Sequence, residues 1–339
     1  MGLLTYISRR VLFLVILVFG ITTMVFLLTQ LVPGEPELAY LSQRSLSDEE
    51  VVAAFRARWG LDQPLYVQYL TYIKNLAQGD LGTSFRTNQP VLVDLKHYLP
   101  ATIELAVIAI IIAAVFGILF GVLSATWPNS WIDHVLRTIS VTGVSIPSFW
   151  FALLVLYVFY FQLGWSPGPG RLGAWSTAPD PVTRFYIIDA LIQKQWAVAG
   201  EAFRHVFWPA LVLGAFTMGL ITRTNRSSLL ETMSMDYIRT ARAKGLGEVA
   251  VVTRHAFGNA FIPVITVIGL GFGNLLGGAV LVETIFSWPG IGMYAYRSAI
   301  SLDFPAISGV ALVIAINYVI INLIVDIIYG IIDPRIRYQ

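Results

Sequence analysis

Few side chains in this sequence have the types and spacing needed for bond-breaking chemistry. Cysteine is absent, which excludes a thiol nucleophile and thiolate ligands for a metal. The histidines lack the short spacing of a metal site, and they are His97, His134, His205 and His255. No phosphate-binding loop of the Walker A type occurs in the sequence. We therefore expect a non-catalytic chain with no metal and no cofactor of its own.

The most informative polar segment is 223–258, in which basic side chains are mixed with small ones. Two short helices are expected on either side of Gly245, because glycine permits a sharp turn. Either Ser234 or Asp236 supplies a side-chain cap for the first helix. A small, positively flanked helix at a membrane surface suits two roles. It contacts lipid headgroups, or it inserts into a cleft on a partner protein.

The elements that must position this segment are long apolar runs. Hydrophobic residues make up 56% of the chain and charged residues 12%, against roughly a quarter charged in a soluble domain. A helix needs about 20 apolar residues to cross the hydrocarbon core, and lipid offers no partner for an open backbone. The sequence therefore predicts an all-α integral membrane protein with six transmembrane helices. Their expected spans are 11–32, 101–126, 140–164, 206–222, 259–283 and 305–331.

The distribution of basic residues predicts the orientation. Arg9 and Arg10 precede the first span and favour a cytoplasmic N-terminus. Six crossings then place both termini and the segments 127–139 and 223–258 inside. The segments expected outside are 33–100, 165–205 and 284–304, and the first two are too long for plain connectors. A net charge of +2, with no basic tract interleaved with aromatics, argues against nucleic acid as a partner.

Several residues within the spans have polar or conformational roles. Gly269, Gly273 and Gly277 recur every four residues and favour close helix packing. Glu104 is expected near the outer boundary, where partial hydration makes an acid tolerable. Polar residues inside a span are functional candidates, with interhelical hydrogen bonding an equal alternative for the asparagines. The candidates for lining a water-filled pathway are Ser145, Pro147, Ser148, Asn274, Asn317 and Asn322.

The segment 236–245 and its surroundings resemble a known family. Together with 254–256 and 259–263, it looks like the EAA loop of ABC importer permeases, and most of all the dipeptide, oligopeptide and nickel branch. Arg239 stands where the general pattern has glutamate, a departure that resembles the peptide branch. Further similar segments are 31–36, 59–69, 79–84, 99–105, 283–292 and 333–337. The chain is identified as similar to the B-type subunits of dipeptide permeases.

This resemblance implies a single domain over 1–339, the transmembrane domain of a type I ABC importer in a prokaryotic inner membrane. It implies a heteromeric complex with a paralogous permease subunit, two ATP-binding subunits that carry ATP and Mg, and an extracytoplasmic substrate-binding protein. The residues it assigns to the coupling helix are Asp236, Tyr237, Arg239, Thr240, Ala241, Arg242, Ala243, Lys244 and Gly245. Di- and oligopeptides are the implied substrates, with nickel chelates, glutathione and oligosaccharides as alternatives.

Other classes of protein fit the residues less well. A secondary transporter normally carries an ionisable residue near the membrane midplane, where it couples transport to an ion gradient. No span has such a residue at its centre. The same absence argues against an intramembrane enzyme. An ion-coupled secondary transporter is kept as the alternative from a different class.

Overall fold

The computed structural model describes residues 15–28, 41 and 43–332. This part of the chain is helical and contains no strand, with one isolated bridge between Thr83 and Pro90. A helix covers Val15–Leu28 of the first expected span. The rest of that span, Arg9, Arg10 and the segments 31–36 and 333–337 lie outside the described residues.

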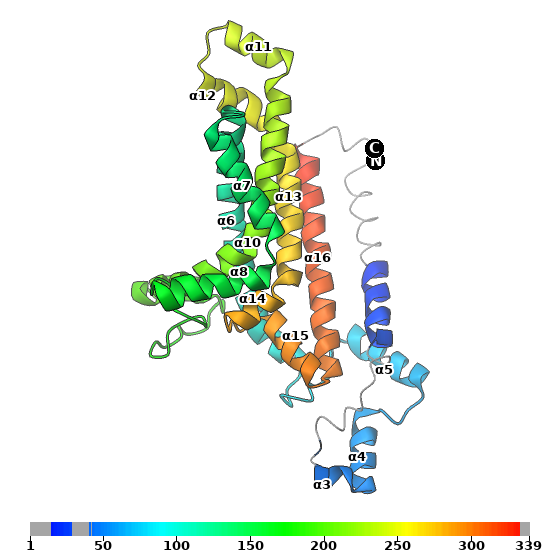
Figure 1. The fold of residues 1–339 in the computed structure, drawn as a ribbon. Coiled ribbons are helices and arrows are strands. Elements are labelled where there is room, and N and C mark those ends of the chain that lie inside the picture. Colours follow the sequence, from blue (N-terminus) through cyan, green and yellow to red (C-terminus); the bar gives the residue numbers. More distant parts are fainter. Residues whose placement is uncertain (1–14, 29–40, 42, 333–339) are drawn as a thin grey trace.

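Long helices run side by side and form the body of the protein (Figure 1). They are α6 (Val91–Thr126), α7 (Trp131–Ser145), α10 (Trp196–Met233), α13 (Phe257–Gly278) and α16 (Phe304–Ile332). Helix α10 packs against α6, α7 and α13. Among the described residues, four helices are long and apolar enough to cross a membrane, or five if a bent pair counts as one span. Val15–Leu28 is a shorter apolar helix.

The bent pair replaces the single span expected at 140–164. Helix α7 ends at Ser145, and α8 (Ser148–Val155) continues into a π-helix, η1 (Leu156–Gln162), at an angle of 110° to α7. Proline disfavours the helical conformation of the residue before it, and Ile146 accordingly has ψ of 127°. Pro147 therefore redirects the chain, and α8 projects from the side of the bundle, across the direction of the long helices, in Figure 1.

Helix α10 is much longer than the span expected at 206–222. Charged residues on both sides of that apolar run suggested its limits, yet the helix continues through them. His205 is buried, and its Nδ1 lies 3.0 Å from the carbonyl oxygen of Glu201. Arg226 forms an ion pair with Asp133 of α7. A neighbouring helix thus satisfies Arg226, and the helix's own backbone satisfies Nδ1 of His205, two polar groups that the apolar pattern alone treats as a boundary.

Helices α6 and α10 approach each other closely along small residues. A Cβ atom added at Gly214 would lie 2.6 Å from the carbonyl oxygen of Ala109. Similar overlaps would arise at Gly117 with Ile221 and at Gly121 with Asn225. Small residues permit such backbone approach in membrane bundles. The α6–α10 contact is therefore the tightly packed spine of the protein.

The end of the bundle opposite α11 is closed by short helices. Helix α13 stops at Gly278, five residues before the expected end of its span, and α14 (Val280–Ile285) and α15 (Ile291–Ile300) follow. The buried carboxylate of Glu283 accepts hydrogen bonds from Thr102 Oγ1 at 2.6 Å and from the backbone N–H of Met293 at 2.9 Å. These bonds hold the α14–α15 turn against α6.

The remaining elements are small and lie in the segments expected outside or at the α11 end. They are α3 (Gln43–Leu46), α4 (Glu49–Trp59), α5 (Leu65–Ala77), α9 (Tyr186–Ile192), α11 (Asp236–Ala243), α12 (Glu248–Ala250) and the π-helix η2 (Val251–Ala256). The hydroxyl groups of Thr23 and Tyr69 lie 2.8 Å apart, so the helix over Val15–Leu28 is tied to α5.

Candidate functional site

Helices α11 and α12 project from one end of the bundle, here called the α11 end (Figure 1). Helix α11 follows α10 after only Ser234 and Met235. Met235 is the N-cap residue of α11 and provides no side-chain hydrogen bond. The hydroxyl of Ser234 donates instead to the carbonyl oxygen of Glu231, and Asp236 is already the first helical residue. The expected cap by Ser234 or Asp236 is therefore wrong.

One face of α11 is anchored in a hydrophobic cluster. Ile238 is fully buried and Ala241 is 6% exposed, three residues further along the same face. The cluster also contains Ala125, Leu229, Val251, Val252, Ala256 and Ala260, which come from α6, α10, η2 and α13. Burial of an isoleucine side chain contributes about 1.5–3 kcal/mol. Helix α11 is thus fixed to the bundle through its buried face.

The turn after α11 is closed by polar contacts. Gly245 has φ of 81°, and its N–H donates to the carbonyl oxygen of Arg242 at 2.9 Å. The guanidinium group of Arg242 binds both carboxylate oxygens of Glu248, at 2.7 and 3.1 Å. On the other side, Asn259 Nδ2 donates to the hydroxyl of Tyr237 at 2.8 Å. These contacts give α11 and α12 a defined relative geometry.

The outer face of this turn is available to a partner. Its exposed residues are Asp236, Tyr237, Arg239, Thr240, Ala243, Lys244, Gly245, Leu246 and Val249. An interfacial lipid-binding helix inserts its apolar face into the bilayer. The apolar face of α11 is already occupied by the bundle, and Val249 is 79% exposed at the tip. The arrangement favours insertion into a cleft on a protein over contact with lipid headgroups.

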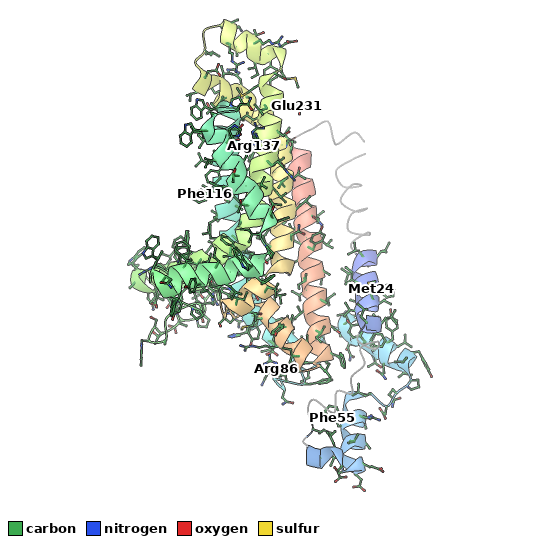
Figure 2. All side chains as sticks on the ribbon, in the orientation of Figure 1. Met24, Phe55, Arg86, Phe116, Arg137 and Glu231 are labelled. Carbon is green, nitrogen blue, oxygen red and sulfur yellow. The ribbon has the colours of Figure 1, made fainter. Side chains whose placement is uncertain are left out.

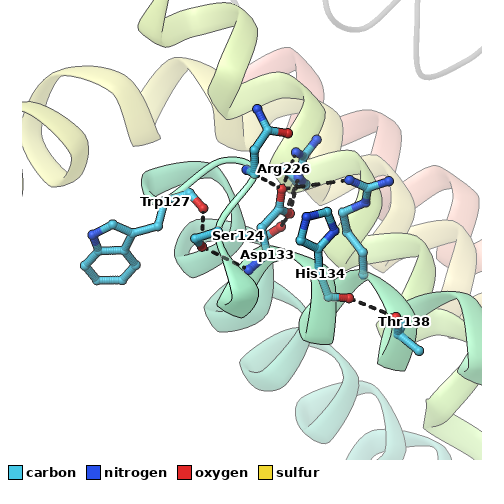
Figure 3. Close-up of polar contacts among 9 residues, drawn as sticks. Ser124, Trp127, Asp133, His134, Thr138 and Arg226 are labelled. Carbon is cyan, nitrogen blue, oxygen red and sulfur yellow. Dashed lines mark hydrogen bonds and ion pairs between the residues drawn. The ribbon is translucent and has the colours of Figure 1, made fainter.

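A buried ion pair connects the helix that carries α11 to its neighbours (Figure 3). Asp133 of α7 is fully buried, and Arg226 of α10 binds both of its carboxylate oxygens, at 2.9 and 2.8 Å. Ser124 of α6 donates to the same carboxylate through its hydroxyl group. The N–H of Asn129, in the α6–α7 turn, donates to it at 2.9 Å. One carboxylate therefore joins α6, α7 and α10.

This network was missed from the sequence. A usable signal was present, because Asp133 and Arg226 fall in 127–139 and 223–258, two segments expected on the same side of the membrane. Arg226 lies seven residues, about two helical turns, before the end of α10, and ten residues before α11 begins. The ion pair therefore joins α7 and α6 to the part of α10 that leads into α11.

The residues expected to line a pathway lie at separate places in the structure. Ser145 and Pro147 line an open depression of about 540 Å³ at the α7–α8 bend, and Ser148 is exposed beside it. Asn274 lines a second depression, of about 510 Å³, between α13, α16 and the helix over Val15–Leu28. Asn317 is half-buried and donates to the carbonyl oxygen of Val313 in its own helix, α16. The structure therefore brings together only the residues at the bend.

Asn322 and the three glycines belong to the region around α13 and α16. Asn322 is half-buried on α16. A Cβ atom at Gly273 would lie 3.1 Å from Tyr318, and one at Gly277 would lie 3.5 Å from Ile314, so both glycines face α16. Gly269 is half-buried on the same helix, α13.

The segment after η1 is held to α6 by a buried ion pair. Glu104 is 6% exposed, and its carboxylate lies 2.5 Å from Nη2 of Arg171 and accepts the N–H of Ile187 at 3.0 Å. The guanidinium group of Arg171 stacks over the ring of Tyr186. The expectation that hydration makes Glu104 tolerable is wrong, since a buried arginine neutralises it.

Asp189 organises the same segment from α9. It is 1% exposed and accepts the N–H groups of Val182, Thr183 and Arg184, as well as the hydroxyl of Thr183. Burial favours the protonated form of Asp189, but these hydrogen bonds outweigh it and hold its pKa below the usual range. The segment is therefore an ordered surface suited to contact with another protein.

A bundle of membrane helices that carries an anchored, outward-facing helix at one end suits the membrane component of a transport system. Comparison with known protein families agrees with this class. The family described as "Binding-protein-dependent transport system inner membrane component" matches residues 117–338. Its N-terminal companion, "Binding-prot-dependent transport system membrane comp, N-term", matches residues 3–106. The chain belongs to this family of inner membrane permease components.

Individual relatives align over nearly the whole chain. The probable D,D-dipeptide transport system permease protein DdpB of Escherichia coli K12 is 45% identical over 95% of this chain and 94% of its own length. The dipeptide transport system permease protein DppB of Alkalihalophilus pseudofirmus is 44% identical over 99% of this chain and 100% of its own. The glutathione transport system permease protein GsiC of Salmonella choleraesuis is 37% identical over 99% of this chain and 100% of its own length.

Proposed function

We propose that this chain is the permease subunit of an ATP-driven importer that moves di- and oligopeptides across the inner membrane. The observation that carries the proposal is the anchored α11, with Ile238 and Ala241 buried and a polar face exposed. A coupling helix transmits displacement rather than performing chemistry, so it must be fixed to the helices that it moves. The dipeptide relatives supply the substrate class.

The proposed complex contains a paralogous permease subunit, two ATP-binding subunits and an extracytoplasmic substrate-binding protein. The exposed face of 236–245 docks on an ATP-binding subunit, which supplies ATP and Mg. The proposed topology has six spans and cytoplasmic termini, with Val15–Leu28 in the first span and α7–α8 together as the third. The outer regions 33–100 and 165–205 receive the substrate-binding protein.

Transport follows an alternating-access cycle. Closure of the ATP-binding subunits displaces α11, and the anchoring cluster passes this displacement to α6, α10 and α13. The ion pair between Arg226 and Asp133 passes it to α7. The pathway then opens outward, and ATP hydrolysis resets it. In this scheme the chain contributes coupling and pathway, and no bond-breaking residue.

Reconstitution of the complex tests this proposal. The chain is purified from mildly solubilised membranes, its companions are identified by mass spectrometry, and uptake of a labelled dipeptide is measured in liposomes. ATP-dependent uptake that requires the substrate-binding protein supports the proposal. Uptake by the chain alone, without ATP and driven by an ion gradient, would refute it in favour of a secondary transporter.

Glutathione is the second candidate substrate, because a glutathione permease component is 37% identical over nearly the full length. Glutathione is itself a short peptide with two carboxylates, so a peptide pathway accommodates it chemically. Competition between labelled dipeptide and unlabelled glutathione in the same liposomes separates the two. The same assay examines nickel chelates and oligosaccharides.

A further inference from the structure

Helix α5 separates apolar from polar side chains. Spacings of three, four and seven residues place side chains on the same face of a helix. The residues that share the apolar face in this way are Leu65, Tyr66, Tyr69, Leu70 and Ile73. Those on the opposite face are Gln68, Thr71 and Asn75. The half-buried Val67 lies between the two faces. Helix α5 is therefore amphipathic, and its apolar face needs a cover.

The apolar face of α5 is turned toward the helix over Val15–Leu28. The hydroxyl groups of Thr23 and Tyr69 lie 2.8 Å apart, and Tyr69 is in the middle of the apolar face. The ring of Phe26 packs against those of Tyr69 and Tyr72, at centroid distances of 5.2 and 5.7 Å. Figure 1 shows α5 beside the end of this helix that is farther from α11. The rest of the apolar face is therefore turned to whatever surrounds that end of the helix.

Side chains on both sides of this contact remain exposed. Leu65 is 59%, Tyr66 is 70% and Leu70 is 62% exposed. The adjoining helix is exposed in the same way, because Met24 (Figure 2) and Leu27, which follow its contact residues, are 64% and 55% exposed. Lipid covers the apolar side chains that a membrane helix exposes. The exposed face of α5 continues this surface, so lipid is the cover that suits both helices.

The charges of α5 also suit a lipid surface. The helix contains no aspartate or glutamate, and its one basic residue, Lys74, is exposed four residues after Leu70. A lysine at the edge of an apolar face lays its stem over apolar surface and brings its ammonium group to the headgroups. Tyrosine is enriched at the same boundary. Helix α4 differs, because Asp48 at its N-cap and Glu49 and Glu50 in its first turn are exposed.

We propose that α5 lies along the outer surface of the lipid bilayer, with Leu65, Tyr66 and Leu70 among the acyl chains. Lys74 then reaches the phosphate groups of the lipid. The inference rests on the proposed topology, in which Val15–Leu28 belongs to the first span. It divides the first outer region into two parts. Helix α5 is held at the membrane, and the charged α4 is turned to water, where it stays available to the substrate-binding protein.

Spin labelling tests the proposal in the assembled complex in liposomes. The chain has no native cysteine, so each variant presents one thiol, and the other subunits are used in cysteine-free form. Leu65→Cys, Tyr66→Cys and Leu70→Cys place a label on the apolar face. Thr71→Cys is the matched control, because Thr71 is exposed on the polar face directly after Leu70.

The two relaxation reagents are molecular oxygen, which concentrates in lipid, and a nickel chelate, which stays in water. We expect oxygen to relax the three labels on the apolar face at least about three times more strongly than the nickel chelate does, and we expect the reverse at position 71. The result should be the same with and without the substrate-binding protein, because the bilayer provides the cover.

Two outcomes would overturn the proposal. Weak relaxation by both reagents at positions 65, 66 and 70 would show that another protein subunit covers the face. Stronger relaxation by the nickel chelate would show that the face lies in water. Because three positions report on the same face, a variant that fails to assemble leaves two others to decide the result.

A label at Met24→Cys separates this proposal from the topology on which it rests. We expect oxygen to dominate there, as for a residue in a span. Nickel dominance at Met24 would refute the proposed topology together with the placement of α5, whereas nickel dominance at α5 alone would refute only that placement. ATP-dependent uptake by the unlabelled complex tests the importer function independently.

Discussion

Breaking the Asp133–Arg226 pair should have unequal effects depending on which partner is removed. Asp133 is fully buried, whereas the side chain of Arg226 is 22% exposed. Arg226→Met leaves a carboxylate with no access to water, whose nearest remaining cation is the half-exposed Arg137 at 3.9 Å. Removing one partner of a buried ion pair typically costs about 3–5 kcal/mol, and we expect this variant to fall in that range.

Asp133→Asn should cost less. The single amide oxygen keeps the hydrogen bond from Ser124, made to Oδ1 of Asp133, or the one from the N–H of Asn129, made to Oδ2, but not both. Arg226 reaches water along its exposed edge. Loss of a hydrogen bond to a charged group costs about 1.5–3 kcal/mol. The double variant Asp133→Asn with Arg226→Met removes both charges, so we expect it to be more stable than Arg226→Met alone. Residues in direct contact couple by about 0.5–3 kcal/mol, which sets the expected recovery.

Thermal unfolding of the purified complex, together with ATP-dependent uptake, measures this cycle. Arg226→Lys is the matched control, because lysine keeps the charge but cannot bind both carboxylate oxygens. We expect its stability to lie between those of the native chain and Arg226→Met. Asp133→Asn proving more damaging than Arg226→Met would refute the reasoning from burial. A double variant whose loss equals the sum of the two single losses would show that the pair is not coupled.

Three further predictions concern the turn after α11 and the α9 segment. Ala241→Asp puts a charge into the anchoring cluster and should abolish uptake while the protein stays in the membrane. The matched control Ala243→Asp, on the exposed face of α11, should keep the cluster intact. Normal uptake in the Ala241 variant would remove the basis of the coupling role. Gly245→Val should reduce uptake and lower the free energy of unfolding by about 1–2 kcal/mol. No neighbouring atom opposes the added side chain, so the cost is the backbone strain at φ of 81°. The matched control Gly247→Ala should be neutral, because φ there is −69°. The lowered pKa means that Asp189 stabilises its segment fully at pH values above 3.8, the ordinary pKa of an aspartate. This stabilisation is lost only as the pH falls through the lower pKa that Asp189 has in the folded state. Amide exchange at 182–184, corrected for intrinsic rates, should therefore be constant from pH 5 to 8 and faster in Asp189→Asn; a change near pH 6–7 would contradict this.

The apolar pattern predicted the helical membrane class and the approximate position of most helices. It limited α10 to 206–222 because it treats every charge as a boundary, whereas the helix runs over Trp196–Met233. A hydropathy pattern contains no information about pairing between distant residues. Asp133 and Arg226 are 93 positions apart, and their contact is a product of the fold.

The α11 turn was foreseeable because its information is local. Gly245 fixes a turn by its own conformational freedom, and the residues around it resemble a family motif. Pro147 lies within a span expected to be continuous, and the 110° bend after it was not predicted, since this angle depends on how α8 packs against α10 and α14. The proline thus indicates where the helix breaks, whereas the angle of the break depends on packing.

The length of α10 has a mechanical consequence. The first part of α10 runs beside α8 in Figure 1, and the helix contains Pro209. The 25 residues from Pro209 to Met233 alone are about 37 Å long at 1.5 Å per residue, against roughly 30 Å for the hydrocarbon core. Because α10 continues to Met233 before α11 begins, the turn that we propose docks on an ATP-binding subunit stands on a stalk of helix. Under that proposal, membranes of different thickness meet different stretches of α10 without altering the geometry of α11. Adaptation to hydrophobic mismatch is then separated from the proposed contact with the ATP-binding subunit.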